Sequence, residues 1–258
     1  MTQLLDGMEA LVRQAGEIAR QKMPQVHEKA CHDYVTEADL EVSQFLCQRL
    51  PELVPGSGVY SEEGADEDCR HGKWFVVDPI DGTTNLMYSL NLSAISCAYM
   101  EDGETLAAVV MNPFNGELFQ AGKGMGATLN GQPIHVNPDA DMAHSLIGFE
   151  GGPMTAHQQG AYFQAIYRLF AASRGIRQLG SAALDLCYIA CGRLTAVPFH
   201  YLFPWDYAAG ELILREAGGV LTTYRGDAPS YFGRSCPLAA SNGRIHQAML
   251  DELKDIQE

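Results

Sequence analysis

The stretch of sequence that decides the fold of this chain is Asp78-Pro79-Ile80-Asp81-Gly82-Thr83-Thr84-Asn85. It follows the apolar run Trp74-Phe75-Val76-Val77, which has the pattern of a buried strand that ends in acidic residues. Pro79 blocks helical continuation and Gly82 frees the backbone, so the main chain must curl with both aspartates near its concave side. Asp, Pro and Gly are also common in solvated turns, so the spacing alone leaves an ordinary turn as the alternative.

Further acidic residues stand where secondary structure is predicted to change. Glu62 follows the strand-like run Val59-Tyr60-Ser61, and Asp206 stands at a predicted helix start. Two carboxylates about 4 Å apart repel by roughly 4 kcal/mol at an effective dielectric near 20, so a cluster of them favours a bound cation. Hard oxygen ligands select magnesium, manganese or calcium over zinc or copper. Each acid alone is weak support, because carboxylates also cap helices.

The segment Gly82-Thr83-Thr84 supplies backbone N–H groups and hydroxyls beside the predicted metal site. Such groups are what a phosphate-binding loop needs. The formal net charge of -15 would repel nucleic-acid backbones and anionic lipid surfaces, so we expect no nucleic-acid or membrane partner bound through a basic patch. A small anionic ligand must therefore be drawn in by cations and N–H groups.

Three main motifs and several supporting ones, spread over nearly the whole chain, carry a resemblance to a known family. The main motifs are residues 78–85, Ser61-Glu62-Glu63 and Trp205-Asp206-Tyr207-Ala208-Ala209-Gly210. The supporting ones are Val35-Thr36-Glu37-Ala38-Asp39, Gly124-Met125-Gly126-Ala127 with Asn130-Gly131, Arg177-Gln178-Leu179-Gly180-Ser181-Ala182-Ala183, and Glu216-Ala217-Gly218-Gly219. Together they resemble the inositol monophosphatase family. The resemblance implies a layered αβαβα fold, usually dimeric, with magnesium as cofactor and lithium as a typical inhibitor.

The resemblance also implies how the metal ions would be held. Glu62, Asp78 and the carbonyl of Ile80 would bind one magnesium ion. Asp78, Asp81 and Asp206 would bind a second. A third, weaker ion would sit near Glu62. The implied reaction is hydrolysis of a small phosphomonoester by metal-activated water, without a covalent intermediate.

Catalytic and phosphate-binding roles follow from the same resemblance. Glu62 and Thr83 would position and deprotonate the attacking water, with Asp39 hydrogen-bonded to the Thr83 hydroxyl. Asp39 also fits the N3 position of a helix capped by Thr36, and the two roles can coexist. The residues expected around the phosphate and substrate are Asp81, Gly82, Thr83, Thr84, Gly180, Ser181 and Asp206.

The leaving group of the substrate is left open by the sequence. Relatives that act on inositol phosphates carry an acidic residue six positions before the Trp of the Trp-Asp pair, and here that position is Phe199. An aromatic wall at Phe199 would suit a planar or apolar substrate, because a polyol would lose a charged hydrogen bond of roughly 1.5 to 3 kcal/mol. Histidinol phosphate, fructose 1,6-bisphosphate and nucleotide 3'-phosphate are alternatives. So is a catalytically retired relative with a binding or regulatory role.

Periodicity predicts an α+β first half, residues 1–138, and an α/β second half, residues 139–258, packed as one globular unit. Helices are expected over residues 4–23, 36–50, 156–172, 182–192, 207–217 and 245–253. Strands are expected over residues 59–61, 74–77, 95–100, 105–111, 118–121, 134–136, 145–149 and 176–179, and near residues 195, 220 and 238. Turns are expected at Asp102-Gly103, Asn115-Gly116 and Asn130-Gly131.

Composition and cysteine usage are those of an ordinary globular protein. Hydrophobic residues make up 47% of the 258 positions and charged residues 19%. The seven cysteines are odd in number and form no C-x-x-C pair, so we expect them to be reduced. The N-terminal residues lack a secretory pattern, and no apolar stretch is long enough to span a membrane. We therefore expect a cytoplasmic protein, with the family resemblance implying a homodimer.

Overall fold

The structure, a computed structural model, describes residues 1–21, 26–30, 33–63, 71–151, 156–229 and 235–256. Its helices are α1 (Thr2–Gln21), α2 (Glu37–Leu53), α3 (Thr83–Met87), the 3-10 helix η1 (Met142–His144), α4 (Ala156–Ala172), α5 (Ala182–Ala190), α6 (Pro204–Glu216) and α7 (His246–Leu253). Its strands are β1 (Val26–Ala30), β2 (Asp33–Thr36), β3 (Gly58–Ser61), β4 (Lys73–Asp81), β5 (Ala94–Glu101), β6 (Glu104–Met111), β7 (Leu118–Gly122), β8 (Gly126–Leu129), β9 (Gln132–Pro133), β10 (Leu146–Gly148), β11 (Gly175–Arg177), β12 (Ala196–Leu202), β13 (Val220–Thr223) and β14 (Cys236–Ser241).

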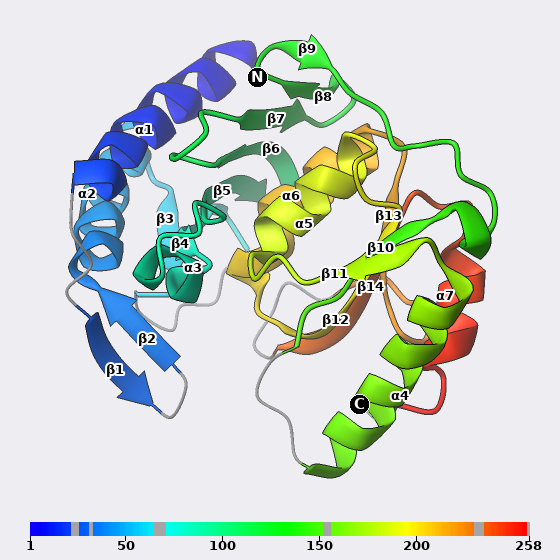
Figure 1. The fold of residues 1–258 in the computed structure, drawn as a ribbon. Helices are drawn as coiled ribbons and strands as arrows, with labels where there is room; N and C mark the ends of the chain where they lie inside the picture. The colour runs from blue at the N-terminus through cyan, green and yellow to red at the C-terminus, as the bar shows by residue number, and fades with distance from the viewer. Residues whose placement is uncertain (22–25, 31–32, 64–70, 152–155, 230–234, 257–258) are drawn as a thin grey trace.

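The elements stack in five layers (Figure 1). Helices α1 and α2 pack on the outer face of a seven-stranded sheet, in the order β3-β4-β5-β6-β7-β8-β9. Helices α5 and α6 lie between that sheet and a five-stranded one, in the order β11-β10-β12-β14-β13. Helices α4 and α7 cover the far face of the second sheet. The layered αβαβα architecture predicted from the sequence is confirmed.

The seven-stranded sheet is an antiparallel meander with one parallel pair at its edge. Strands β3 and β4 run parallel, and each later neighbour is antiparallel. Two of the predicted hairpin turns hold both central residues at positive φ: Asp102 at 49° with Gly103 at 81°, and Asn130 at 49° with Gly131 at 76°. Asn-Gly and Asp-Gly pairs suit such turns because their backbone twist matches that of the flanking strands.

Some element boundaries differ from the predictions. Helix α2 runs through Pro51 to Leu53, because a proline in the last turn gives up only one backbone hydrogen bond. Residues 134–136 form no strand: the N–H of Ile134 still reaches the sheet, but that of Val136 donates to the carbonyl of Ala217 beyond α6. The hairpin β1–β2 and the short strand β8 were not predicted, since neither shows a clear apolar alternation.

The structure bears on two expectations, that the cysteines are reduced and that no segment spans a membrane. The cysteines that the structure describes are free thiols, as expected: Cys47, Cys97, Cys187, Cys191 and Cys236. Within the described part of the chain, no helix combines the length and the apolar character that crossing a membrane requires.

Helices α5 and α6 meet through small residues at the centre of the molecule. In the motif after Asp206, Gly210 lies at this contact, and its neighbours Ala208 and Ala209 are fully buried in the same core. A Cβ atom built on Gly210 would lie 2.7 Å from Cδ1 and 2.8 Å from Cβ of Leu186. The absence of a side chain at Gly210 therefore lets the two helices approach closely.

We expect the substitution Gly210→Ala to lower the free energy of unfolding by about 1–2 kcal/mol, because overpacking outweighs the gain in helix propensity. Urea denaturation followed by circular dichroism measures this change. The matched control is Gly160→Ala in α4, where a new Cβ meets no atom within 4 Å. That control should gain up to about 1 kcal/mol. A Gly210→Ala protein at least as stable as the unchanged protein contradicts the packing argument.

Candidate active site

The parallel pairing of β3 with β4 brings the first two acidic segments together. Ser61 lies opposite Val77 in this pair, and the N–H of Glu62 donates to the carbonyl of Val77 at 3.4 Å. Because the carboxyl ends of parallel strands lie at the same edge of a sheet, Glu62 and Asp78 leave the sheet side by side. Glu62, just after β3, and Asp78, near the end of β4, thus form one acidic edge of the sheet.

The predicted curl of the main chain is present at the end of β4. The pairing of β4 with β5 shifts register between Asp78 and Asp81, where Pro79 interrupts the ladder. The N–H of Ile80 donates to Asp78 Oδ1 at 3.0 Å, and the side chain of Asp78 is 2% exposed. A buried aspartate at this position rules out the solvated turn that the spacing alone had left open.

Gly82 turns the chain into α3 with a φ of 89°. A Cβ atom here would lie 2.8 Å from the carbonyl oxygen of Gly180 and 3.0 Å from that of Leu92. Both the left-handed backbone and this close approach require glycine. Within the described residues, nothing accepts a hydrogen bond from the N–H groups of Gly82, Thr83 and Thr84, so they remain available to an anion.

Asp81 is bound to the start of α5. Its Oδ2 accepts hydrogen bonds from the Ser181 hydroxyl at 2.6 Å and from the N–H of Ala183 at 2.7 Å. Ser181 is itself the N-cap of α5. Burial raises the pKa of Asp81 to about 6, although the hydrogen bonds act in the opposite direction. The interaction ties the second half of the chain to the strand end that carries the acids.

Asp206 reaches the same place from the first turn of α6. The helix begins at Pro204, three residues earlier than predicted, so Asp206 takes its N3 position and accepts the N–H of Phe203 at 2.7 Å. The Ser96 hydroxyl donates to the carbonyl of Trp205 at 3.4 Å, and Ser96 lies opposite Asp78 in the sheet. This contact places Asp206 next to Asp78.

The convergence of carboxylates dominates the electrostatics of the site. Burial is the main reason that the pKa of Asp78 lies well above its ordinary value, and repulsion from Glu62, Asp81, Asp206 and Asp39 raises it further. The pKa of Asp206 is raised well above its ordinary value by burial, then by Asp81 and Glu62. Such mutual repulsion is relieved when a cation binds among the carboxylates.

The donor atoms suit a hard divalent cation. Asp78, Asp81 and Asp206 each use one carboxylate oxygen for a hydrogen bond, which leaves Asp78 Oδ2, Asp81 Oδ1 and Asp206 Oδ1 without a bond to the described part of the chain. Across that part, no three side chains of His, Cys, Asp or Glu are arranged closely enough to form a metal centre. Binding would therefore require small side-chain movements that bring these oxygens together.

Asp39 and Thr83 are hydrogen-bonded to each other. Asp39 is the N3 residue of α2, where its Oδ2 accepts the N–H of Thr36 at 2.9 Å and also the Thr36 hydroxyl. Its Oδ1 accepts the Thr83 hydroxyl at 3.0 Å. The Thr83 hydroxyl also lies 3.2 Å from the carbonyl of Ile80. The capping position and the contact with Thr83 thus coexist.

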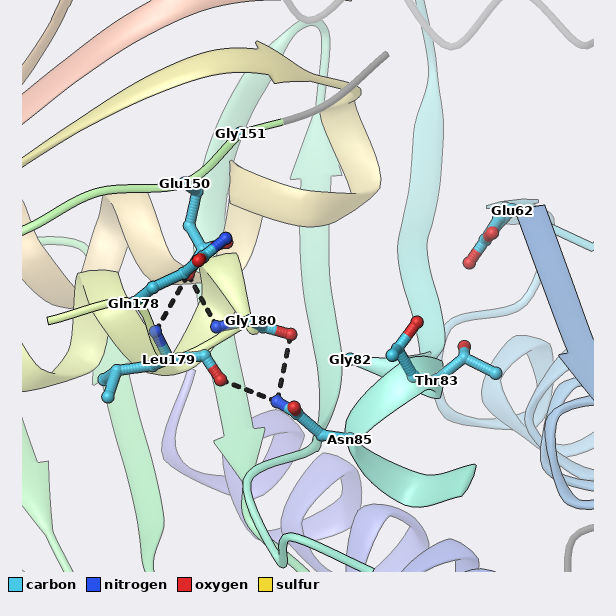
Figure 2. Close-up of a pocket in the computed structure, with 10 residues that line it drawn as sticks. Glu62, Gly82, Thr83, Asn85, Glu150, Gly151, Gln178, Leu179 and Gly180 are labelled. Atoms are coloured by element: carbon cyan, nitrogen blue, oxygen red, sulfur yellow. Dashed lines mark hydrogen bonds between the residues drawn. The ribbon is translucent and has the colours of Figure 1, made fainter. Parts of the chain in front are cut away.

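A cavity of about 500 Å³ opens over these groups. The residues that line it are Glu62, Gly82, Thr83, Thr84, Asn85, Glu150, Gly151, Gln178, Leu179 and Gly180. Figure 2 shows Glu62 and Thr83 on one side, and Glu150, Gln178 and Leu179 on the other. None of these lining residues is Lys or Arg. Among the described residues, the cavity wall therefore combines carboxylates with free N–H groups and includes no basic side chain.

The sequence did not point to Glu150 or Gln178 as cavity residues. Gln178 lies within residues 177–183, which resemble the family, but the resemblance implies no role for this side chain. Glu150 follows a three-residue strand and no turn or cap marks it. Only the pairing of β10 with β11 and β12 brings these two segments together.

The expectation that Phe199 forms an aromatic wall is wrong. Its side chain is 0% exposed and belongs to the apolar core between the five-stranded sheet and helices α5 and α6. The direction of a strand side chain alternates along β12, which the six-residue spacing to Trp205 could not reveal. The aromatic rings beside Asp206 are instead those of Phe203 and Trp205, stacked at 4.8 Å, and of Tyr60, 5.2 Å from Trp205.

Comparison with known proteins agrees with this architecture. A model of the inositol monophosphatase family matches residues 1–258. The Nus factor SuhB of Salmonella typhimurium is 35% identical over 234 residues, 88% of this chain and 85% of that protein. The inositol-1-monophosphatase of Mesorhizobium japonicum is 35% identical over 233 residues, 89% and 86% of the two chains. The solved IMPase of Thermotoga maritima has a TM-score of 0.87 at 31% identity, over 98% of this chain and 97% of that one.

The layered αβαβα fold is thus shared with the solved IMPase of Thermotoga maritima. The chain belongs to the inositol monophosphatase family. Membership supports phosphatase activity, and the family is generally metal-dependent, in agreement with the donor atoms around Asp78.

We expect Asp78→Asn to stabilise the protein at pH 8 in the presence of a chelator. The raised pKa of Asp78 means that the folded state keeps a proton which the unfolded chain releases above about pH 4, so stability is lost as the pH rises past that point. Asparagine removes this loss. Thermal unfolding should show a higher Tm for the variant at pH 8 and little difference near pH 3.5.

The control for this measurement is Asp227→Asn, a change at an exposed position outside the cavity. It should shift the Tm equally little at both pH values. Added magnesium should raise the Tm of the unchanged protein more than that of Asp78→Asn, since binding to the folded state alone stabilises it. Equal Tm values for Asp78→Asn and the unchanged protein at pH 8 would show that the pKa of Asp78 is not raised in the folded protein.

Proposed function

We propose that the protein hydrolyses a small phosphomonoester in a magnesium-dependent reaction, by direct attack of water and without a covalent intermediate. The observation that carries this proposal is the composition of the cavity wall. As far as the described residues line it, this wall offers carboxylates, hydroxyls and free N–H groups but no Lys or Arg. A phosphate ester can bind beside several carboxylates only when divalent cations offset their charge.

Five groups would hold two ions. Glu62, Asp78 and the Ile80 carbonyl would hold the first, and Asp78, Asp81 and Asp206 the second, with a third, weaker ion near Glu62. When bound, such ions neutralise charge on the phosphate oxygens and make water a better nucleophile. The free oxygens of the three aspartates support this assignment.

The protein's own groups would orient the nucleophile. The Thr83 hydroxyl donates its hydrogen to Asp39 Oδ1, so its oxygen can accept a hydrogen bond from a water molecule in the cavity. Glu62, on the same side of the cavity, would take the proton that this water loses (Figure 2). The hydrogen bond to Asp39 therefore sets the direction in which Thr83 presents its lone pairs.

The phosphate would rest on the segment that begins α3. The N–H groups of Gly82, Thr83 and Thr84 point to no acceptor among the described residues. The carbonyl of Gly180 lies against Gly82, and Ser181, next to Gly180 in the chain, donates its hydroxyl to Asp81. Backbone N–H groups in this arrangement bind phosphate without adding a basic side chain.

The substrate that we propose is a polyol monophosphate of the inositol type. The burial of Phe199 removes the reason for expecting an aromatic or apolar leaving group. The cavity of about 500 Å³ has the size of a small-molecule site, and its far wall offers the polar side chain of Gln178. The relative from Mesorhizobium japonicum carries the name inositol-1-monophosphatase. A homodimer in the cytoplasm completes the proposal.

A binding role is the second candidate function, because a relative of 35% identity is named as a Nus factor. The two functions make different demands on the site. Turnover needs Asp78 and Thr83, whereas a binding surface elsewhere on the molecule does not. The net charge of -15 argues that a partner of this kind would be a protein and not a nucleic acid bound through its phosphates.

We expect Asp78→Asn and Thr83→Ala each to lower kcat by at least about 100-fold, the size of effect typical for loss of electrostatic stabilisation or of a group that activates the nucleophile. Steady-state phosphate release in magnesium buffer measures this. Thr128→Ala, at a position in β8 outside the cavity, serves as the control and should retain full activity. Near-normal turnover by Asp78→Asn would refute the two-ion assignment.

We expect inositol 1-phosphate to give the highest kcat/KM in a panel that also contains histidinol phosphate, fructose 1,6-bisphosphate and a nucleotide 3'-phosphate. Hydroxyl groups on the leaving group can bond to the polar far wall, while the metal side is common to all four esters. Phosphate release is measured with magnesium and again with chelator, which should stop it. No turnover of any ester with magnesium would favour the binding role.

A further inference from the structure

Glu150 lies at the back of the cavity on a segment with a firmly held main chain. It follows β10 and forms a parallel bridge with Phe199. Its N–H donates to the carbonyl of Pro198 and its carbonyl accepts the N–H of His200, each at 3.2 Å. The Tyr162 hydroxyl donates to the same carbonyl at 2.7 Å. The side chain of Glu150 is 9% exposed, and the main chain that carries it is held to the five-stranded sheet by these hydrogen bonds.

The carboxylate of Glu150 accepts hydrogen bonds from the main chain of Leu179 and Gly180, on its own side of the cavity. Its Oε1 accepts the N–H of Leu179 at 3.1 Å and the N–H of Gly180 at 2.6 Å. The carbonyls of the same two residues accept Asn85 Nδ2 at 2.6 and 3.2 Å. Figure 2 shows this chain of hydrogen bonds. The segment Leu179–Gly180 is therefore held through its N–H groups from one side and through its carbonyls from the other.

This segment touches the start of α3 with no side chain between them. The carbonyl oxygen of Gly180 lies 2.8 Å from the place that a Cβ of Gly82 would occupy. Gly180 has a φ of 74°, and a Cβ on it would lie 2.9 Å from Asn85 Nδ2. A shift of Leu179–Gly180 would therefore move Gly82 and the Asn85 amide. This amide also donates to the carbonyl of Leu92 at 2.7 Å.

Behind Glu150 lies a second acid, Asp185 of α5, that the proposed reaction does not use. It is 0% exposed, and neither of its carboxylate oxygens meets a donor in the described part of the chain. An ionised Asp185 would be left without solvation. A protonated Asp185 can donate to Glu150, and this hydrogen bond lowers the pKa of Glu150 and raises that of Asp185.

The charges around the pair agree with one retained proton. Burial is the main cause that raises both pKa values, that of Glu150 to about 7 and that of Asp185 well above its ordinary value. Asp81 raises both further. The other groups near Glu150 are Tyr162, which donates to its carbonyl, and His200, whose ring lies 5.2 Å from that of Tyr162. No cation among the described residues balances the two acids.

We infer that Glu150 is a positioning residue, whose carboxylate fixes the Leu179–Gly180 wall against Gly82 and Asn85 while Asp185 holds the one proton that the buried pair shares. The inference rests on the proposed function. In-line displacement puts the leaving group opposite the attacking water. Glu62 and Thr83 lie on the water side, and the wall held by Glu150 lies across the cavity from them (Figure 2). Glu150 thus positions the groups that face the leaving group.

The first test compares Glu150→Ala with Glu150→Gln. Removal of both charge-assisted hydrogen bonds in Glu150→Ala should lower kcat/KM on inositol 1-phosphate by about tenfold or more. Glutamine keeps an oxygen acceptor for both N–H groups and should restore kcat/KM to within about threefold of the unchanged protein. Glu252→Gln, the same chemical change on exposed α7, is the control and should have no effect.

The second test reads the shared proton without using activity. Infrared spectroscopy of the metal-free protein at pH 8 should show the C=O band of a protonated carboxyl group in a buried site, and Asp185→Asn should remove that component. The neutral amide still donates to Glu150, so kcat/KM of Asp185→Asn should stay within about threefold of the unchanged protein. Absence of any change in this band on Asp185→Asn overturns the assignment of the proton.

Failure of the inference and failure of the proposed function give different results. If the unchanged protein hydrolyses no ester, the proposed function fails, and the infrared result still decides the shared proton. If it is active and Glu150→Ala is equally active, or Glu150→Gln is no better than Glu150→Ala, the positioning role is overturned. Should Glu150→Ala not fold, Glu150→Asp replaces it, because its shorter carboxylate cannot reach both N–H groups.

Discussion

Repulsion among buried carboxylates is the constraint on which this structure depends. Asp78 is almost fully buried, with Glu62, Asp81, Asp206 and Asp39 close enough to raise its pKa. Three of these carboxylates lie at the N-terminus of a helix. Asp39 lies in the first turn of α2 and Asp206 in that of α6, while Asp81 accepts hydrogen bonds from the start of α5. The positive ends of these helices offset part of the negative charge. The remaining negative charge is the reason that we propose cation binding at this pocket.

The cavity is assembled from both sheets, and a set of hydrogen bonds joins their contributions. The acids and the start of α3 come from the edge of the seven-stranded sheet. The opposite wall, with Glu150 and the segment Leu179–Gly180, comes from the five-stranded sheet. Asn85 joins the two, because its amide bonds to carbonyls on both sides. One wall carries Glu62 and the start of α3, and the other carries Glu150, Gln178 and Leu179, the side that we propose faces the leaving group.

Shared ancestry and shared function are different questions for this chain. Relatives of equal identity carry the names inositol-1-monophosphatase and Nus factor SuhB. Overall similarity therefore does not choose between the functions. The argument for hydrolysis comes from particular groups. Thr83 and Asp39 remain hydrogen-bonded beside the acids, an arrangement with no evident structural need beyond the cap that Asp39 already provides. The costly burial of Asp78 points the same way.

The sequence by itself was enough to identify the side of the site that we propose binds metal and phosphate. Proline, glycine and paired aspartates over residues 78–85 restrict the local backbone so strongly that a short motif predicts the curl, and periodicity predicted most helices and the antiparallel strands. Tertiary structure decided the rest. The burial of Phe199, the pairing of Glu150 with Asp185, and the contact of Glu150 with Leu179 and Gly180 depend on side-chain direction and on contacts between segments that are distant in the chain, such as Glu150 and Gly180, 30 residues apart. No local pattern encodes these, because they arise only when two sheets and the helices between them pack together.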